Sequence, residues 1–179
     1  MEPLKGHRLH LEALARLRDL PAWECWLVGG AQQPSEERYL EEIKTRCVRL
    51  TIDRRVRFFG ERSDVRRLLS AADIYCQPNT SPDSFGLTFV EGLLAQLPVV
   101  TTALGGALEI VDSTCGFLVP PDDPAALAAC LRQLIVDPDL RSRLGAAGPG
   151  RARDLCDPSK QMARVDDFFQ EVSSSVAAA

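Results

Sequence analysis

Residues 78–96 of the chain, PNTSPDSFGLTFVEGLLAQ, are the segment most informative about the fold. The apolar residues just before the segment, at 73–76, predict a strand, and the apolar residues from Gly86 to Gln96 predict a helix. Between them lies a loop rich in Pro, Asn, Ser and Asp, the residue types that favour turns. The segment is therefore predicted to be a strand–loop–helix junction.

The same alternation of strands and helices extends along the rest of the chain. We expect strands at residues 24–28, 56–59, 73–76, 98–101 and 116–119, and helices at residues 7–20, 35–50, 64–72, 86–96, 124–136, 138–146 and 158–173. Such alternation predicts an α/β fold, a Rossmann-like parallel sheet with helices on both faces. The carboxyl ends of the strands, where such sheets bind ligands, fall at Gly29, Gly60, Pro78 and Thr102.

Composition narrows the class of protein. Hydrophobic residues make up 45% and charged residues 26% of the 179 positions, as in ordinary globular domains. The net charge of −4 provides no basic field for nucleic acid. We find no signal-peptide pattern and no apolar run near the ~20 residues of a membrane span. The six cysteines form no C-x-x-C motif and are expected to act as small hydrophobic residues in a reducing cytoplasm.

The helix expected from Gly86 has the features of an anion site. The first N–H groups of a helix, here those of Gly86, Leu87 and Thr88, lack intrahelical acceptors, and the helix dipole adds positive potential, which suits a diphosphate. Glu91, one turn further on, could accept both hydroxyls of a ribose, and Asp83, before the helix, could accept hydroxyls of a sugar beyond the diphosphate. For an isolated acidic pair, a solvated Glu91 on an amphipathic helix is the simpler interpretation.

The order of the surrounding segments resembles the C-terminal domain of GT-B glycosyltransferases, in particular the retaining family 4, or group 1. The matching segments are Lys5-Gly6, Leu27-Val28-Gly29-Gly30, Val56-Arg57-Phe58-Phe59-Gly60, Ala72-Asp73-Ile74, Pro78, Asp83-Ser84-Phe85-Gly86 with Glu91, Pro98-Val99-Val100, Gly105-Gly106-Ala107-Leu108-Glu109 and Gly116-Phe117-Leu118-Val119-Pro120. The resemblance covers residues 4–172. Each segment is weak alone, but together they occur in the family's order and spacing.

The resemblance assigns roles to the acidic pair and to a lysine. Asp83 and Glu91 occupy the positions of the family's E-x7-E motif, in which the second carboxylate holds the ribose and the first contacts the transferred sugar. Asp83 is one methylene shorter than the usual Glu. Lys5 matches a lysine that neutralises the donor diphosphate, which would stabilise the leaving nucleotide. Asp83 and Lys5 are thus the catalytic candidates.

The resemblance also implies a set of donor-binding positions. These are Gly29, Gly60, Glu61, Arg62, Phe85, Gly86, Leu87, Thr88, Glu91, Gly105 and Gly106. Gly60 to Arg62 resemble the loop beside the base, and Gly105-Gly106 a loop close to the donor sugar, although the residues alone indicate only a turn. No cofactor is implied beyond the substrate, a nucleoside-diphosphate sugar such as a UDP- or GDP-sugar. No metal is expected, because the sequence has no Asp-x-Asp and nothing near His7 and His10 completes a ligand set, so a solvated or edge position is expected for both histidines.

GT-B enzymes bind donor and acceptor between two domains, so the resemblance implies a partner acceptor domain in cis or in trans. We expect a nucleotide-sugar-binding domain at residues 1–157, and a C-terminal helix with a frayed tail at 158–179. The family's domain also begins with a central strand ahead of residue 1, without which the sheet should show an exposed edge or an incomplete core. The apolar face of the last helix (Met162, Val165, Phe168, Phe169 and Val172) would then favour self-association.

Three functions remain open from the sequence. The first is the donor half of a retaining hexosyltransferase, cytoplasmic or peripheral to the membrane in the full enzyme, and inactive as the isolated chain. The second is a nucleotide-sugar-binding module without transferase activity, which the shortened Asp83 would suit. The third is another GT-B chemistry, epimerisation or phosphorolysis, although no lysine is placed for pyridoxal phosphate. Base, sugar and acceptor are not determined.

Overall fold

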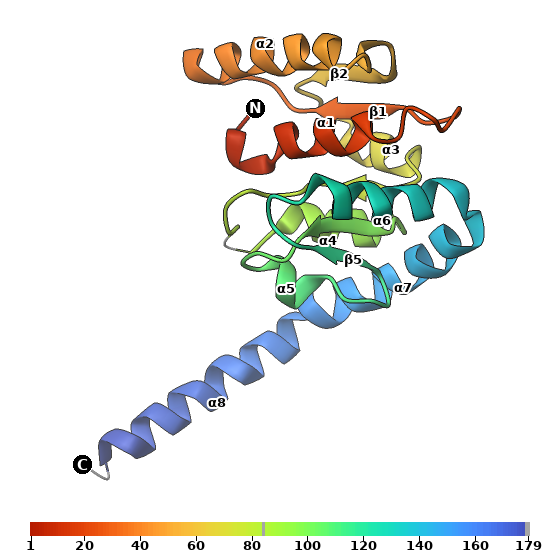
Figure 1. Ribbon diagram of the computed structural model, residues 1–179. Coiled ribbons are helices and arrows are strands. Elements are labelled where there is room, and N and C mark those ends of the chain that lie inside the picture. The colour runs from red at the N-terminus through yellow and green to blue at the C-terminus, as the bar shows by residue number, and fades with distance from the viewer. Residues whose placement is uncertain (84, 178–179) are drawn as a thin grey trace.

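A computed structural model describes residues 1–83 and 85–177, so Ser84 of the predicted donor loop lies outside the described residues. The strands are β1 (Cys25–Val28), β2 (Val56–Gly60), β3 (Tyr75–Cys76), β4 (Val99–Thr102) and β5 (Gly116–Val119). The helices are η1 (Pro3–Lys5), α1 (His7–Ala15), α2 (Pro34–Arg49), η2 (Asp53–Arg55), α3 (Val65–Ser70), α4 (Leu87–Leu94), α5 (Ala107–Ile110), α6 (Pro124–Val136), α7 (Pro138–Cys156) and α8 (Pro158–Ala177). The predicted fold class, parallel strands flanked by helices, is confirmed (Figure 1).

The strands form two sheets rather than one. β1 pairs in parallel with β2, and β3, β4 and β5 form a second parallel sheet with β4 in the centre. Within the part of the chain that the structure describes, β1 and β3 are not hydrogen-bonded to each other. The interruption between the two sheets lies between β1 and β3.

The central strand β4 separates two hydrophobic cores. Its four residues are all buried, because helices cover both faces. Val100 joins the core formed with α1, α2 and α6, and Val99, on the opposite face, joins the core formed with α4, α5 and α7. Because neighbouring strand residues point to opposite faces, α1 and α6 lie on one side of the sheets and α4 and α7 on the other.

Helix α7 is longer than predicted. We expected it to end near residue 146, because Gly148, Pro149 and Gly150 usually interrupt a helix. The helix instead continues to Cys156 because its glycines allow close packing on α4. A Cβ atom at Gly148 would lie 2.6 Å from the carbonyl oxygen of Leu93, and one at Gly145 would lie 2.2 Å from that of Gln96.

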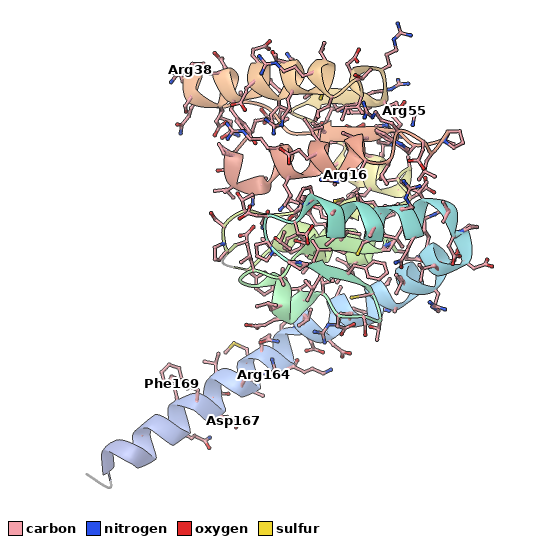
Figure 2. All side chains as sticks on the ribbon, viewed as in Figure 1. Arg16, Arg38, Arg55, Arg164, Asp167 and Phe169 are labelled. Carbon is pink, nitrogen blue, oxygen red and sulfur yellow. The ribbon has the colours of Figure 1, made fainter. Side chains whose placement is uncertain are left out.

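Helix α8 projects away from the rest of the molecule and continues to Ala177, beyond the predicted end at residue 173 (Figure 1). Its predicted apolar face is exposed at Met162, Val165, Phe168 and Phe169, while the side chain of Val172 lies outside the described part. Figure 2 shows Phe169 and Asp167 projecting from α8 well away from the sheets.

The cysteines follow the prediction with one exception. Cys25, Cys47 and Cys115 are buried, and burial raises the pKa of the Cys25 thiol to about 12 and that of Cys47 to about 11. Such thiols act as small apolar side chains. Cys156, at the end of α7, is exposed and is not part of a core.

One histidine of α1 differs from the predicted solvated or edge position. His10 is buried, whereas His7 is half-buried, as an edge position allows. Burial is the main cause that lowers the pKa of each from 6.5 to about 4. Burial disfavours the charged form of each imidazole, so both are neutral at pH 7.

Leu93→Ala is expected to destabilise the chain by about 2–5 kcal/mol, because a fully buried leucine leaves a cavity. The matched control is Leu94→Ala, at a leucine that is 53% exposed, where a change within about 0.5 kcal/mol is expected. Denaturant unfolding measures both variants. Equal losses would contradict the packing of α4 described above.

Acidification from pH 7 to pH 5 is expected to destabilise the chain through His10. The pKa of His10 is about 4 in the folded state and about 6.5 unfolded, so between these values the unfolded chain binds more protons. Stability is then fully present above about pH 6.5 and is lost as the pH falls towards 4, by about 2 kcal/mol at pH 5. Urea unfolding at both pH values measures the loss, and the His10→Gln variant should lose clearly less stability than the parent chain. An equal loss in the variant would remove His10 as the cause.

Candidate functional site

A cavity of about 890 Å³ lies between the two sheets. One side is formed by residues 22–30, which contain β1, and the other by residues 71–77, which contain β3. Helices α1, α3, α4 and α6 also contribute to its lining. The cavity therefore extends along the strands from their amino ends to their carboxyl ends.

The carboxyl end of this cavity is polar. Six residues predicted to bind donor or to act in catalysis lie around it, namely Lys5, Gly29, Glu61, Arg62, Thr88 and Glu91. They come from η1, from the loops after β1 and β2, and from α4. This end lies where the strand order changes direction, the position at which open α/β sheets bind their ligands.

Glu91 and Thr88 lie one turn apart on α4. The Glu91 side chain is exposed, whereas the hydroxyl oxygen of Thr88 is buried and lies beside the Tyr75 hydroxyl, with which it interacts. Thr88 lines the cavity, so its hydroxyl could exchange this contact for a hydrogen bond to a ligand that enters. Glu91 is therefore exposed on the cavity wall, where its carboxylate is accessible to a ligand or to solvent.

A short backbone connection places Lys5 at the site. The Thr80 N–H donates to the Leu4 carbonyl oxygen over 2.8 Å. Gly6, with φ of 73°, lies so close to Pro78 that a Cβ atom would be 1.7 Å from its carbonyl oxygen. Only glycine allows this approach. The chain around Lys5 is thereby fixed against the loop after β3.

Lys5 is ion-paired with Asp83. The distance from Lys5 Nζ to Asp83 Oδ2 is 2.9 Å, and the side chains are 27% and 21% exposed. The two catalytic candidates are therefore brought together, although Asp83 itself does not line the cavity. In this state the lysine ammonium and the carboxylate neutralise each other.

The first turn of α4 is closely packed against the preceding loop. Gly86 is buried with φ of 84°, and a Cβ atom there would lie 2.5 Å from the Phe89 ring. The Phe89 N–H donates to the Gly86 carbonyl oxygen, which fixes the first turn. Phe85 and Leu87 are exposed on either side, at 45% and 66%. These three predicted donor contacts lie beside the cavity and are not part of its lining.

The Gly105-Gly106 loop packs on the Asp83 loop. The Gly106 N–H donates to the Asp83 carbonyl oxygen over 3.1 Å. A Cβ atom at Gly105 would lie 2.7 Å from the same oxygen, and one at Gly106 would lie 2.6 Å from the Phe85 carbonyl oxygen. The two glycines thus support the predicted sugar-binding loop and do not themselves reach the cavity.

The loop after β2 carries the predicted base contacts. Gly60 does not line the cavity, and its carbonyl oxygen accepts from the Gly29 N–H over 2.8 Å, which joins the ends of β1 and β2. Glu61 follows and lies against Gly30, where a Cβ atom would be 3.3 Å from that of Glu61. Arg62 is held by two hydrogen bonds of 2.8 Å to Asp64.

Several residues of the cavity were not predicted from the sequence. Met1 is one, since its ammonium group donates to the Gly30 carbonyl oxygen and lies 3.2 Å from Glu36 Oε2. Gln77 is another, fixed by hydrogen bonds with Tyr75 and Asn79. No local pattern marks these residues, because their position depends on contacts between distant segments. Gln77 could have been suggested by its place directly after a predicted strand.

In the part of the chain that the structure describes, no three His, Cys, Asp or Glu side chains are grouped as a metal site requires. None of the described helices is both long and apolar enough to cross a membrane.

Comparison with known proteins identifies the family. Residues 1–137 match the family model of glycosyl transferases group 1. The chain is 31% identical, over 99% of its length, to a phosphatidyl-myo-inositol mannosyltransferase of Mycobacterium leprae, and covers 47% of that protein. It is 30% identical, over 88% of its length, to the human alpha-1,3/1,6-mannosyltransferase ALG2, of which it covers 40%.

Solved structures agree with this assignment. The structure of Anabaena Alr3699/HepE in complex with UDP and glucose has a TM-score of 0.81 and 29% identity, over 100% of this chain and 46% of that one. The chain thus spans about half the length of the relatives it matches. The predicted family resemblance is confirmed, and the chain belongs to the group 1 glycosyltransferases, with the fold of their GT-B structures.

Proposed function

We propose that this chain is the donor-binding half of a retaining glycosyltransferase, which binds a nucleoside-diphosphate sugar and transfers the hexosyl group to an acceptor held by another domain. The observation that carries the proposal is the polar end of the cavity, where Lys5, Thr88 and Glu91 surround one space at the carboxyl ends of the strands. A cation, a helix N-terminus and a carboxylate are the groups that a diphosphate and a ribose require.

In the proposed complex, α4 and Glu91 hold the nucleotide. The diphosphate would extend from the cavity to the adjacent start of α4, near the Thr88 hydroxyl, and the exposed Glu91 carboxylate would accept the ribose hydroxyls. Glu61 and Arg62 lie at the other wall, near the base. A structural relative in complex with UDP and glucose supports this class of ligand.

The ion pair of Lys5 and Asp83 must be rearranged when the donor binds. Lys5 would neutralise the diphosphate, and this stabilises the nucleotide as the bond to the sugar breaks. Asp83 would then accept a hydrogen bond from a hydroxyl of the transferred sugar in place of the one from Lys5. The chain supplies no covalent nucleophile in this scheme, since its groups act on the leaving diphosphate, and the anomeric configuration is retained.

Transfer itself requires the acceptor domain. The chain spans about half the length of its relatives, two of which are mannosyltransferases by name. Residues 1–157 would bind the donor, and α8 would pack against the acceptor half through its exposed apolar residues. A binding module without transfer remains the second candidate, because Asp83 is shorter than the glutamate of the family motif.

Glu91→Gln is expected to weaken UDP binding at least about tenfold, because an amide is a poorer acceptor for two ribose hydroxyls than a carboxylate. Titration calorimetry with UDP, GDP and ADP measures the affinity. The matched control is Glu37→Gln, an exposed glutamate on α2 outside the cavity lining, which should leave binding unchanged. Binding of UDP that is equal in both variants would overturn the ribose assignment, and no binding of any nucleotide by the parent chain would overturn the donor site.

Lys5→Met is expected to weaken UDP binding by about tenfold while leaving uridine binding unchanged, because only UDP carries the diphosphate. Asp83→Asn should strengthen UDP binding, because it removes the carboxylate that competes with the diphosphate for Lys5. Parallel titrations of both variants with UDP and uridine test this pair. Equal loss for UDP and uridine in Lys5→Met would assign Lys5 a structural role only.

Turnover assays separate the two candidate functions. The isolated chain is expected to bind the nucleotide. It is expected neither to hydrolyse UDP-glucose or GDP-mannose nor to transfer their sugars. Addition of an acceptor half from a relative should restore transfer if the chain is half an enzyme. Transfer by the isolated chain would contradict the half-enzyme proposal, and binding without transfer in the reconstituted enzyme would favour the binding module.

A further inference from the structure

The ring of Tyr75, in β3, packs in a notch on the surface of α4. Gly92 leaves this notch open, because a Cβ atom there would lie 2.9 Å from the ring carbon Cγ and would displace the ring. Phe89 contacts the same ring edge to face, with 6.3 Å between the ring centres. A shift or rotation of α4 would break both contacts, so the ring fixes the helix against β3.

The hydroxyl group of Tyr75 joins α4 to the end of β3. It donates to Gln77 Oε1 over 3.1 Å, and it interacts with the hydroxyl of Thr88 in the first turn of α4. A phenol oxygen can donate one hydrogen bond and accept another, so one group serves both neighbours. Burial is the main cause that raises the pKa of Tyr75, and the phenol therefore keeps its proton at neutral pH.

The row of polar contacts continues into the loop after β3. Gln77 Nε2 donates to Asn79 Oδ1 over 3.0 Å. Both residues are anchored by β4, since Thr101 Oγ1 donates to the Gln77 carbonyl oxygen over 2.8 Å and Thr102 Oγ1 donates to that of Asn79 over 2.5 Å. Tyr75 thus connects α4 to a segment whose backbone is itself fixed by the central strand.

This segment leads into one part of the candidate donor site, and α4 carries the other. Asp83 lies in the loop that follows Asn79, and Glu91 lies on α4 beside Gly92. After burial and the contact with Thr88, the charges of Glu91 and Asp83 are among the causes that act on the pKa of Tyr75. Tyr75 is therefore close to both carboxylates and holds together the two elements that carry them.

We propose that Tyr75 is a positioning residue of the donor site, whose hydroxyl holds α4 and the loop after β3 in the arrangement that binds the nucleotide. The inference rests on the proposed function for the nature of the ligand. It concerns the hydroxyl and not the ring, because a phenylalanine ring would pack in the same notch. Thr88 is the partner of the hydroxyl on the helix, and Gln77 is its partner on the strand.

Tyr75→Phe tests the hydroxyl, because phenylalanine keeps the contacts with Gly92 and Phe89. The variant should bind UDP about fivefold more weakly, since the loss of a hydrogen bond leaves the helix and the loop less firmly held. Titration calorimetry measures the affinity. The matched control is Tyr39→Phe, at the other tyrosine of the chain, which lies on α2 outside the cavity lining and should leave UDP binding unchanged.

A double-mutant cycle separates positioning from a general structural role. Thr88→Val removes the partner hydroxyl and keeps the branched shape of the side chain. In the Thr88→Val background, Tyr75→Phe should weaken UDP binding less than about twofold, because both changes act through one contact. Thr88→Ser, which retains a hydroxyl, should keep the full effect of Tyr75→Phe. Equal losses in the parent and Thr88→Val backgrounds, or UDP affinity in Tyr75→Phe that is unchanged or higher, would overturn the proposal.

Gln77→Met provides a second variant if Tyr75→Phe does not fold. It removes the partner of the hydroxyl on the strand, so a loss of UDP affinity of about fivefold is expected again. Parent-like affinity in Gln77→Met would overturn the proposal.

Amide hydrogen exchange in α4 gives a measurement without a ligand. Exchange should be about fivefold faster in Tyr75→Phe than in the parent chain and unchanged in Tyr39→Phe, because exchange reports how firmly a helix is held. If the parent chain binds no nucleotide but α4 exchanges in this way, the proposed function fails and the role of Tyr75 in placing α4 stands. If UDP binds and Tyr75→Phe changes neither its affinity nor the exchange, the positioning role fails and the proposed function stands.

Discussion

The contact between Gly6 and Pro78 is the constraint on which the site depends. Within the described residues, the two sheets share no hydrogen bonds, so the core of α1 and the contacts of residues 4–6 with the loop after β3 hold them together. At Gly6, any side chain would overlap the Pro78 carbonyl oxygen, and the backbone bond from Thr80 to Leu4 fixes the same approach. This contact places Lys5 opposite Asp83 and sets α1 across the space between the sheets.

A single cavity with two chemical environments follows from this arrangement. Its carboxyl end carries Lys5, Thr88 and Glu91, and its interior is apolar. His10 of α1 belongs to the same arrangement, since it lies on the cavity wall and its burial lowers the pKa of the imidazole. The charged groups at the mouth would suit an anionic ligand there.

Much of the fold could be predicted because it depends on local patterns. The alternation of apolar runs with turn residues indicated the parallel strands and their helices, and Gly86 after a polar loop indicated the start of α4. The length of α7 could not be predicted, because Gly145 and Gly148 are used for contact with α4, and glycines in a sequence do not show whether they break a helix or allow close packing. The burial of His7 and His10 depends likewise on distant elements.

The site was predictable to a similar degree. The types and spacing of Asp83 and Glu91, together with the resemblance to a known family, indicated the residues, and the structure brings Lys5, Thr88 and Glu91 to one cavity. The pairing of Lys5 with Asp83 was not predicted, because it joins residues that are far apart in the chain through loop geometry. The local sequence pattern also could not show that Gly105 and Gly106 pack against the backbone of the Asp83 loop.

The Lys5–Asp83 ion pair links the two halves of the cavity's chemistry. Lys5 belongs to the segment that runs from the carboxyl edge of β1 into α1, and Asp83 belongs to the loop between β3 and α4. Within the described residues the two sheets share no hydrogen bond, so the distance between these segments depends on the contact of residues 4–6 with the loop after β3. A preorganised arrangement of charges stabilises a developing charge better than one that must reorganise. The contact that joins the two sheets would therefore also set the electrostatics of the candidate site.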